Sequence, residues 1–539
     1  MSDQEKMVKA AGVVGLATLL SRILGVIRDM VIAYYFGARF AGEAFVVAFR
    51  IPNLLRQLVA EGSLTVSFIP VFTEYLTNKS RQEAEKLAHV IFTFLLLSLT
   101  GIVILGVIFS PGIVTLMTPG FKAYPEKMAL TIYLTRLLFP YLFFIGLVAF
   151  YMGLLNSLQH FAAPALAPVF LNICMIAAPI LLASCFQEPT TALALGVIAG
   201  GVAQLLFQVP FLKKKGIRLR LDTDFSHPGA VKIGRLMIPR VFGVAVAQIT
   251  VFFNTLLASY CEAGSNFYLY YADRLMELPL GVFAIAMGTV ALPTFSRHVA
   301  EARPQELMKS LSFALRTVLF INLPAMMGLI VLSHPIVNVL FQRGEFDLHT
   351  ATATSQALIC YALGLWAFSA LRVVIPAFYA LQDTKTPVQV AFLALGTHIL
   401  LSLLLVSPLS FNGLALSSSI SSMINLLTLL VILRRRLGRM GGREILSSTL
   451  RISVASLGMG GAAYLVSQTA SWSSPGLGPE KILSLGGAII LSLAIYLVLS
   501  HLLKSPEWGF LAEMGKKALS QFLHLPKKAE PPHQAKAEK

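Results

Sequence analysis

The sequence predicts an all-α, polytopic membrane protein with about fourteen transmembrane helices. Of its 539 residues, 56% are hydrophobic and only 13% are charged, and the mean hydropathy is +0.74. Apolar stretches long enough to cross a bilayer recur along the whole chain, and short polar loops separate them. A closed β-barrel would show shorter segments of alternating hydrophobicity, so the pattern favours helices.

The apolar stretches give the candidate spans in order. They lie at 9–36, 41–72, 88–117, 128–156, 161–185, 191–212, 232–261, 266–295, 309–340, 352–380, 387–406, 411–433, 447–468 and 482–503. Proline lies inside spans such as 41–72 and 309–340, which predicts bent or broken helices there. The first stretch is too long for the core of a signal peptide, so we expect it to remain as the first helix.

Positive charge is concentrated in every second loop. Lysine and arginine cluster after the even-numbered spans, for example at 213–220 and 434–443, whereas the other loops hold few. The positive-inside rule therefore places both termini in the cytoplasm, including a basic tail at 506–539. These loops explain the formal net charge of +17, and they could attract anionic membrane lipids. We expect no nucleic-acid partner.

Short matches at a nearly constant offset indicate an internal duplication. LQHFAAP at 158–164 resembles LQDTKTP at 381–387, and IPVFT at 69–73 resembles LPTFS at 292–296, with the same offset in both matches. RILG at 22–25 resembles RVFG at 240–243, with an offset five residues shorter than that of the other two matches. The repeat contains six spans, an even number, so the halves share one orientation and a pseudo-two-fold axis along the membrane normal. The predicted units are a six-helix lobe at 1–220, a second six-helix lobe at 226–440, and two C-terminal helices at 445–505.

The first span contains charges where a lipid-facing helix should have none. Arg22 lies near its middle, and Arg28 and Asp29 follow within two turns. Because positions seven apart nearly superimpose on a helix, Ser21 lies above Arg28 and Arg22 lies above Asp29. An arginine at mid-bilayer costs at least ~2.5–3.5 kcal/mol and is tolerated where it faces a bundle interior or a wet cavity. We expect a binding cavity here, and interhelical packing is the alternative.

The second and eighth spans carry further polar side chains. Asn53, Arg56 and Glu61 recur at helical spacing and continue the polar face of the first span. In the second lobe, Arg274 occupies the region that corresponds to Arg56, and we expect it in the same cavity. Its acidic neighbours are Asp273 and Glu277. A place in the cavity and a charged helix start at the periplasmic surface explain them equally well. Three other arginines are better explained as side chains near the membrane interface: Arg50, Arg240 and Arg372.

The sequence favours neither catalysis nor metal binding. The four cysteines are scattered without metal-ligand spacing, and the ten histidines include no HExxH motif. A Walker A loop, a nucleophile elbow and a kinase motif set are also missing. We therefore expect no catalytic residue, no metal and no cofactor. His398 lies within a late span, where packing explains it better than proton transfer.

Three stretches carry a family resemblance. They read SRILGVIRDMVIAYYFGA, EAFVVAFRIPNLLRQLVAEGSLTVSFIPVFTEY and YYADRLMELPLGVFAIAMGTVALPTFS. They resemble the MurJ (MviN) family of bacterial lipid II flippases, within the multidrug/oligosaccharidyl-lipid/polysaccharide exporter superfamily. The resemblance extends over nearly the whole chain and includes the segment QDTKTP.

The resemblance implies a multi-pass transporter of the cell inner membrane, with a V-shaped pair of lobes around a cationic cavity. Its substrate would be lipid II, the undecaprenyl-diphosphate-linked peptidoglycan precursor, moved from the cytoplasmic to the periplasmic leaflet without covalent catalysis. The family's essential residues correspond to Arg22, Arg28, Arg56 and Arg274, with Asp29 as acidic partner. The last two helices would hold the polyprenyl tail. A monomer is expected, with membrane lipids and cell-wall synthesis proteins as candidate partners.

Two features depart from the family pattern. Gln57 stands where some members carry another arginine, and spans seven and eleven hold Gln248, Asn254 and Thr397 where some members have sodium-binding carboxylates. A sodium site is therefore not expected. The arginines still suit a diphosphate, because a guanidinium stays charged and can bind two oxygens at once. Four arginines and one aspartate give an expected cavity charge of about +3.

Three alternatives compete with this hypothesis. A member of the same superfamily could export another lipid-linked oligosaccharide, whereas an exporter of cationic drugs should have an acidic cavity. An enzyme that acts on polyprenyl phosphates would need convergent carboxylates, and only Asp273 and Glu277 come close. In a structural scaffold of a cell-wall complex, the buried arginines would be replaceable.

Overall fold

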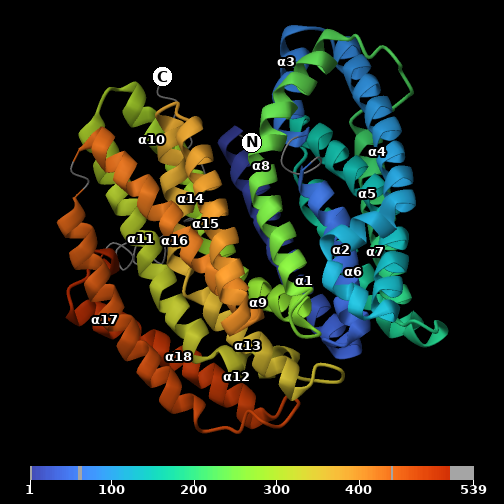
Figure 1. Ribbon diagram of the computed structural model, residues 1–539. Coiled ribbons are helices and arrows are strands. Elements are labelled where there is room, and N and C mark those ends of the chain that lie inside the picture. Colours follow the sequence, from blue (N-terminus) through green and yellow to red (C-terminus); the bar gives the residue numbers. More distant parts are fainter. Residues whose placement is uncertain (1–2, 59–63, 439–440, 510–539) are drawn as a thin grey trace, which may run out of the picture.

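Every regular element of the described chain is a helix. The computed structural model describes residues 3–58, 64–438 and 441–509, so most of the expected tail at 506–539 lies outside the described residues. The first bundle comprises α1 (Asp3–Phe36), α2 (Phe40–Arg56), α3 (Thr65–Asn78), α4 (Arg81–Met117), η2 (Pro119–Ala123), α5 (Pro125–Ser157), α6 (Ala162–Leu182), η3 (Ala183–Cys185) and α7 (Thr190–Lys214). Figure 1 shows these helices on one side of the molecule.

The second bundle lies beside the first. It comprises α8 (Pro228–Ala258), α9 (Ser265–Pro279), the π-helix η4 (Leu280–Ala284), α10 (Ile285–Ala300), α11 (Pro304–Val331), α12 (Ser333–Phe341), α13 (Leu348–Ala362), α14 (Leu365–Ala380), α15 (Lys385–Leu409) and α16 (Phe411–Leu437). Two further helices, α17 (Gly442–Ser467) and α18 (Pro479–Leu502), cover the outer flank of this bundle (Figure 1). The bundles meet near α9 and spread apart toward the end where the N-terminus lies (Figure 1).

The helix bounds repeat with the offset found in the sequence. The single helix α5 spans 125–157, and the bent pair α13–α14 spans 348–380, so both ends are displaced by the offset that separates 158 from 381. The turns that follow contain Gln159 and Gln382, which keep this offset, and both have positive φ angles, 56° and 59°. A non-glycine residue rarely adopts this conformation, so the shared angle supports a common origin of the two turns.

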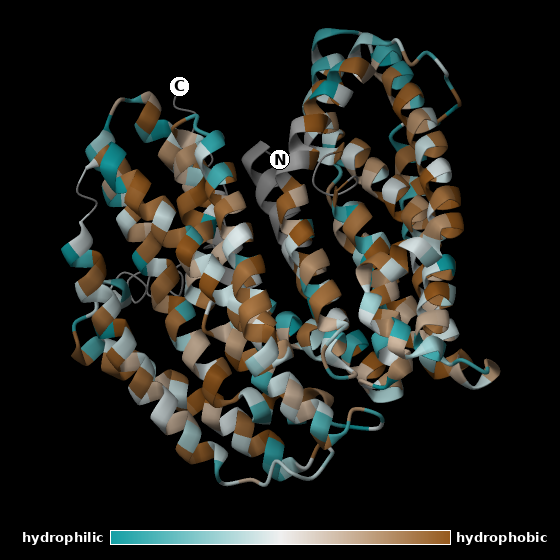
Figure 2. Ribbon diagram, viewed as in Figure 1, coloured by the Kyte–Doolittle hydropathy of each residue, from teal (hydrophilic) through white to brown (hydrophobic). Residues whose placement is uncertain are grey.

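Nine helices within the described residues are long and apolar enough to cross a membrane: α4, α5, α6 with η3, α7, α11, α15, α16, α17 and α18. The pair α13–α14, bent by 42°, would be a tenth. The other candidates, α1, α2–α3, α8 and α9–α10, each include positions outside the described side chains. The all-α membrane fold is confirmed, and the count of fourteen stays a prediction. Figure 2 shows apolar residues along the helix bodies and hydrophilic residues toward their ends.

Each bundle has its own apolar core. Phe68, Phe72 and Phe150 are buried in the first bundle, and Val373 and Phe378 are buried in the second. In lipid these contacts stabilise by close packing rather than by exclusion of water, since lipid tails are as apolar as the side chains. The predicted lobe boundary falls in the loop before α8, and α8 itself contacts both bundles, α3 and α4 as well as α15 and α16. The boundaries of the lobes stay a prediction.

Backbones of the two bundles touch at one end of the molecule. Gly120 precedes α5, and a Cβ atom there would lie 2.1 Å from the carbonyl oxygen of Ser259 at the end of α8. Gly37 follows α1 with a φ of 51°, and a Cβ atom there would lie 2.0 Å from the carbonyl oxygen of Glu345. Any side chain at these positions would push the bundles apart, so glycine permits the close junction.

Candidate functional site

A cavity of about 340 Å³ lies between the two bundles. Its polar lining comes from α1, α9, η4 and α14, and its apolar lining includes Leu340 and Phe341 of α12. The charged residues that line it are Arg22, Arg28, Asp29, Arg274, Glu277 and Arg372. Four arginines against two carboxylates leave a formal excess of two positive charges, one less than the sequence predicted.

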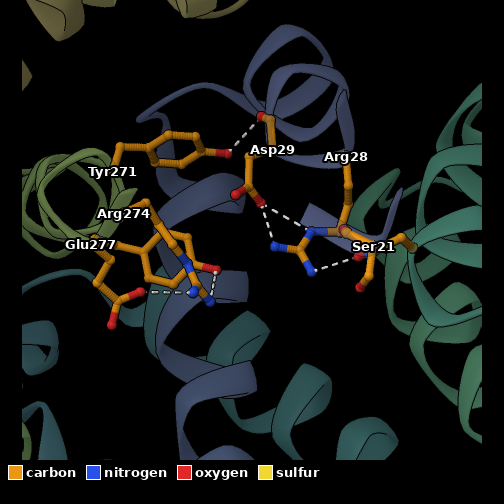
Figure 3. A network of polar contacts seen from close by, with 8 residues as sticks. Ser21, Arg28, Asp29, Tyr271, Arg274 and Glu277 are labelled. Atoms are coloured by element: carbon orange, nitrogen blue, oxygen red, sulfur yellow. Dashed lines mark hydrogen bonds and ion pairs between the residues drawn. The ribbon is translucent and has the colours of Figure 1, made fainter. Parts of the chain in front are cut away.

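Arg28 and Asp29 are the most buried charged residues of this site. Two guanidinium nitrogens of Arg28 donate to Asp29 Oδ1 at 3.0 and 2.7 Å, and the two side chains are 13% and 11% exposed. A third nitrogen donates to Asn172 Oδ1 of α6 at 3.0 Å. The hydroxyl of Tyr271 donates to the backbone carbonyl of Asp29 at 3.1 Å, which ties α1 to α9. Figure 3 shows this network.

Arg22 reaches from the first bundle to the second. Its guanidinium donates to the carbonyl oxygen of Gly281 in η4 at 3.0 Å. A π-helical turn changes the hydrogen-bonding register of the backbone, and such turns are frequent at functional sites. A Cβ atom at Gly281 would lie 2.9 Å from the Arg22 guanidinium, so a glycine here permits the approach.

Arg274 and Glu277 provide the second-bundle side of the cavity. Arg274 pairs with Glu277, one turn further along α9, at 3.2 Å, and the two side chains are 36% and 51% exposed. The same guanidinium lies 5.1 Å from the ring centroid of Tyr270 and donates to its hydroxyl at 3.2 Å. Figure 3 shows the Arg274–Glu277 pair on α9 across from the Arg28–Asp29 pair on α1.

Arg372 of α14 also lines the cavity, although its sequence position favoured a place near the membrane interface. Within the described part of the chain, its guanidinium has no hydrogen-bond or ion-pair partner. The sequence signal that could have found it is the lack of any nearby acidic residue in α14. An arginine inside an apolar helix with no local partner must face water, a ligand or another helix.

Several expected site residues lie elsewhere. Ser21 is in α1, where its carbonyl oxygen accepts a hydrogen bond from Asn172 Nδ2 at 2.9 Å. Arg56 and Asn53 are bonded to each other at 2.9 Å near the end of α2, and neither is among the residues that line the cavity. Glu61 lies outside the described residues. The place of these four residues in a binding site stays a prediction.

Asp273 lines a different cavity, of about 430 Å³, whose walls are mostly helices of the second bundle. Arg50, Asn254 and His398 line it too, and a ring nitrogen of His398 lies 2.9 Å from Asn254 Oδ1. Asp273 and Glu277 therefore line two different cavities, although the sequence made one shared cavity a candidate for both. Arg50 donates to Thr255 Oγ1 at 2.7 Å, which agrees with a structural role. The described residues contain no cluster of three metal-ligating side chains.

The central cavity suits a multivalent anion. Guanidinium groups are planar, remain charged, and can donate two parallel hydrogen bonds to a phosphate. A cleft lined by charge of one sign and walled by apolar helices strengthens its own field, because the low-dielectric walls do not screen it. The two carboxylates hold Arg28 and Arg274 in place and keep the net charge moderate, which favours release as well as binding.

The sequence has relatives along most of its length. Residues 32–477 match the family model described as lipid II flippase MurJ. The chain is 37% identical over 511 residues to a probable lipid II flippase MurJ of Vibrio cholerae, covering 93% of this chain and 96% of the relative. It is 34% identical over 484 residues to the lipid II flippase MurJ of Burkholderia cenocepacia, covering 89% and 94%.

Solved structures show the same fold. A lipid II flippase MurJ in an inward closed conformation matches with a TM-score of 0.75 and 27% identity, over 91% of this chain and 98% of that chain. An inward-facing multidrug resistance MATE transporter matches with a TM-score of 0.64 over 78% of this chain and 95% of that chain. At 17% identity, the second match is a likeness of fold alone.

Proposed function

The chain belongs to the lipid II flippase MurJ family, and on this premise we propose that it moves lipid II from the cytoplasmic to the periplasmic leaflet by alternating access. The observation that carries the proposal is the convergence of Arg22, Arg28, Arg274 and Arg372 in one cavity between two bundles. A diphosphate is the part of lipid II that such a cavity recognises, because each of its phosphates offers several acceptor oxygens.

The barrier to lipid II transfer is desolvation, since a charged sugar-peptide head group loses its hydration in hydrocarbon. A wet cationic cavity replaces lost water contacts with guanidinium donors. Three of the arginines are held by internal acceptors: Asp29 and Asn172, the Gly281 carbonyl, and Glu277. Phosphate oxygens would replace these acceptors around arginine side chains that are already ordered. Binding then has a lower entropic cost than it would have with mobile side chains.

The direction of transport follows from the proposed orientation. The loops near 213–220 and 434–443 are the most basic, which supports a cytoplasmic position for them and for both termini. The junction at Gly37 and Gly120 would then lie toward the periplasm. The bundles would spread toward the cytoplasm, the side where lipid II is made. Rocking of one lobe against the other would close this side and open the junction.

The transporter would act without covalent chemistry and as a monomer. The pair α17–α18 packs against α11 on the outer flank of the second lobe, where it would guide the polyprenyl tail in the membrane. Membrane lipids would surround this flank, and cell-wall synthesis proteins are candidate partners there.

The test is transfer of lipid II across a bilayer. Purified protein is reconstituted in liposomes that contain fluorescent lipid II, and the label exposed to an impermeant quencher is followed over time. We expect transfer that depends on the protein and is lost in Arg28→Ala. Equal transfer of an undecaprenyl-diphosphate oligosaccharide without the pentapeptide would favour another lipid-linked substrate. No transfer of either lipid by folded protein would contradict the proposal.

A further inference from the structure

A buried ion pair lies at the junction of the two lobes. Glu43 is near the start of α2 and Lys127 near the start of α5, and their side chains are 1% and 2% exposed. The Lys127 ammonium donates to the Glu43 carboxylate and lies 3.9 Å from the ring centroid of Phe121. Burial of two charges carries a desolvation penalty that their attraction often fails to offset, so stability is a poor explanation for this pair.

The Glu43 carboxylate also reaches the other lobe. One oxygen accepts the backbone N–H of Gly264 at 2.7 Å, and the other accepts the backbone N–H of Asn266 at 3.0 Å. These donors belong to the first turn of α9, where N–H groups have no partner within the helix and the helix dipole favours a negative charge. Glu43 is thus bonded to a cation of its own lobe and to neutral donors of the opposite lobe.

A second polar residue of α2 contacts the same part of the second lobe. Arg50 lies seven positions after Glu43, hence on the same face of the helix. Its guanidinium faces the side-chain oxygen of Asn266 at 3.4 Å and donates to Thr255 of α8 at 2.7 Å. Asn266 is fully buried between these contacts. One face of α2 therefore carries polar contacts between the lobes at this end.

We propose that Glu43 is a reversible latch that holds the lobes together at this junction, and that Lys127 is the counter-charge that travels with it. Since α2 packs along α5, separation of the lobes leaves the ion pair intact and breaks the two hydrogen bonds that α9 donates to Glu43. Glu43 is then never an unpaired charge, and the freed N–H groups of α9 meet water. The inference rests on the lobe separation in the proposed function.

The test measures the separation directly and needs no substrate. The four cysteines are replaced by serine or alanine, and spin labels are attached at Glu188 before α7 and at Leu348 at the start of α13, both exposed. Distances are measured by pulsed electron paramagnetic resonance in lipid nanodiscs. The variant Glu43→Gln/Lys127→Met removes both charges, so that at most an uncharged amide oxygen accepts from α9 and no unpaired charge is left. We expect the ratio of separated to closed molecules to rise roughly tenfold or more, as loss of charge-assisted hydrogen bonds implies.

Two further variants distinguish the role of Glu43 from the role of Lys127. Glu43→Asp keeps the charge near Lys127 with a shorter reach, and we expect a smaller shift in the same direction. In Lys127→Met alone, the Glu43 carboxylate loses its counter-charge and keeps only the N–H donors of α9. We therefore expect the molecules to stay closed and lipid II transfer to slow. The control Arg39→Ala breaks an exposed ion pair with Glu345 at the same junction, 75% and 37% exposed, and should change nothing.

The proposal fails if the double variant is folded and keeps the distance distribution of the unaltered chain. The role of Lys127 fails if Lys127→Met separates as readily as the double variant. Loss of lipid II transfer with unchanged distances would count against the latch and leave the flippase proposal standing.

Discussion

The Arg28 guanidinium donates to the side-chain oxygen of Asn172 at 3.0 Å, and this contact joins α1 to α6 inside the first lobe. The amide nitrogen of Asn172 in turn donates to the carbonyl oxygen of Ser21 at 2.9 Å. Asn172 therefore fixes both the guanidinium and the backbone of α1 about two turns before Arg28. Such support limits the rotamers available to Arg28 before any ligand binds.

Replacement of Asn172 should misplace Arg28 without removing its charge. We expect Asn172→Ala to lower the lipid II transfer rate by roughly tenfold or more, since a hydrogen bond to a charged group contributes about 1.5–3 kcal/mol. Transfer in liposomes is the measurement. Asn322→Ala is the matched control, because Asn322 is also buried and its amide bonds only its own helix, at Val318. An equal loss in both variants would assign the effect to packing.

Two substitutions of Arg28 distinguish the effect of its charge from the effect of its geometry. Arg28→Lys keeps the positive charge and loses the planar fork, and Arg28→Ala loses both. If Arg28 holds diphosphate, both variants should insert normally and fail to support growth of a flippase-depleted strain, with Ala at least as impaired. Protein level in the membrane is measured beside growth. A folded Arg28→Ala protein that complements fully would remove Arg28 from the site.

Arg372 is predicted to bind substrate through charge alone, since it has no partner that orients it in the described part of the chain. Arg372→Lys should retain most transfer, and Arg372→Ala should weaken substrate binding by roughly tenfold, the scale of one lost charge-assisted hydrogen bond. Arg303→Ala is the control, because Arg303 is exposed in a loop outside the cavity and pairs with Glu301. Transfer rates over a range of lipid II concentrations test this. A large loss in Arg372→Lys would indicate a requirement for fixed geometry.

Substitution by alanine should have opposite effects on stability at two glycines, one at the junction and one away from it. Gly120→Ala should lower the melting temperature, because its Cβ atom would lie 2.1 Å from the Ser259 carbonyl oxygen. Gly112→Ala within α4 meets nothing within 4 Å and should be neutral or stabilising, by up to about 0.5–1 kcal/mol. Thermal unfolding in detergent compares the two. Equal melting temperatures would show that the junction yields without cost.

Asp383 predicts a pH dependence of stability. Hydrogen bonds from the Thr386 side chain and backbone, and then from Arg436, hold the pKa of this loop carboxyl well below its usual range. A lowered pKa in the folded state contributes stability above pH ~4 that is lost as the pH falls further. Asp383→Asn should therefore melt below the unaltered protein at pH 7, and the difference should shrink below pH ~4. A difference in melting temperature that stays the same at all pH values would contradict the link between the Asp383 pKa and stability.

Much of this protein could be predicted from one sequence. Length and hydropathy determine the class of fold, since a lipid-exposed chain must satisfy its backbone within helices. An internal duplication was predicted because one offset relates two short sequence matches, and the bounds of α5 and α13–α14 keep that offset. Arg22, Arg28 and Arg274, which were expected in one cavity, all line the central cavity, because a charge inside an apolar helix must turn away from lipid. Their role in substrate binding stays a prediction.

The tertiary structure decided which helices face one another. Asp273 and Glu277 share a helical face one turn apart, yet they line different cavities, and Arg372 of a distant helix joins Arg28. Nothing in the sequence pairs Glu43 with Lys127, and the structure buries them together at the lobe junction. Helical periodicity determines which side chains share a face of one helix. The rotation of each helix within its bundle, and the meeting of the two bundles, depend on contacts between residues that lie far apart in the sequence.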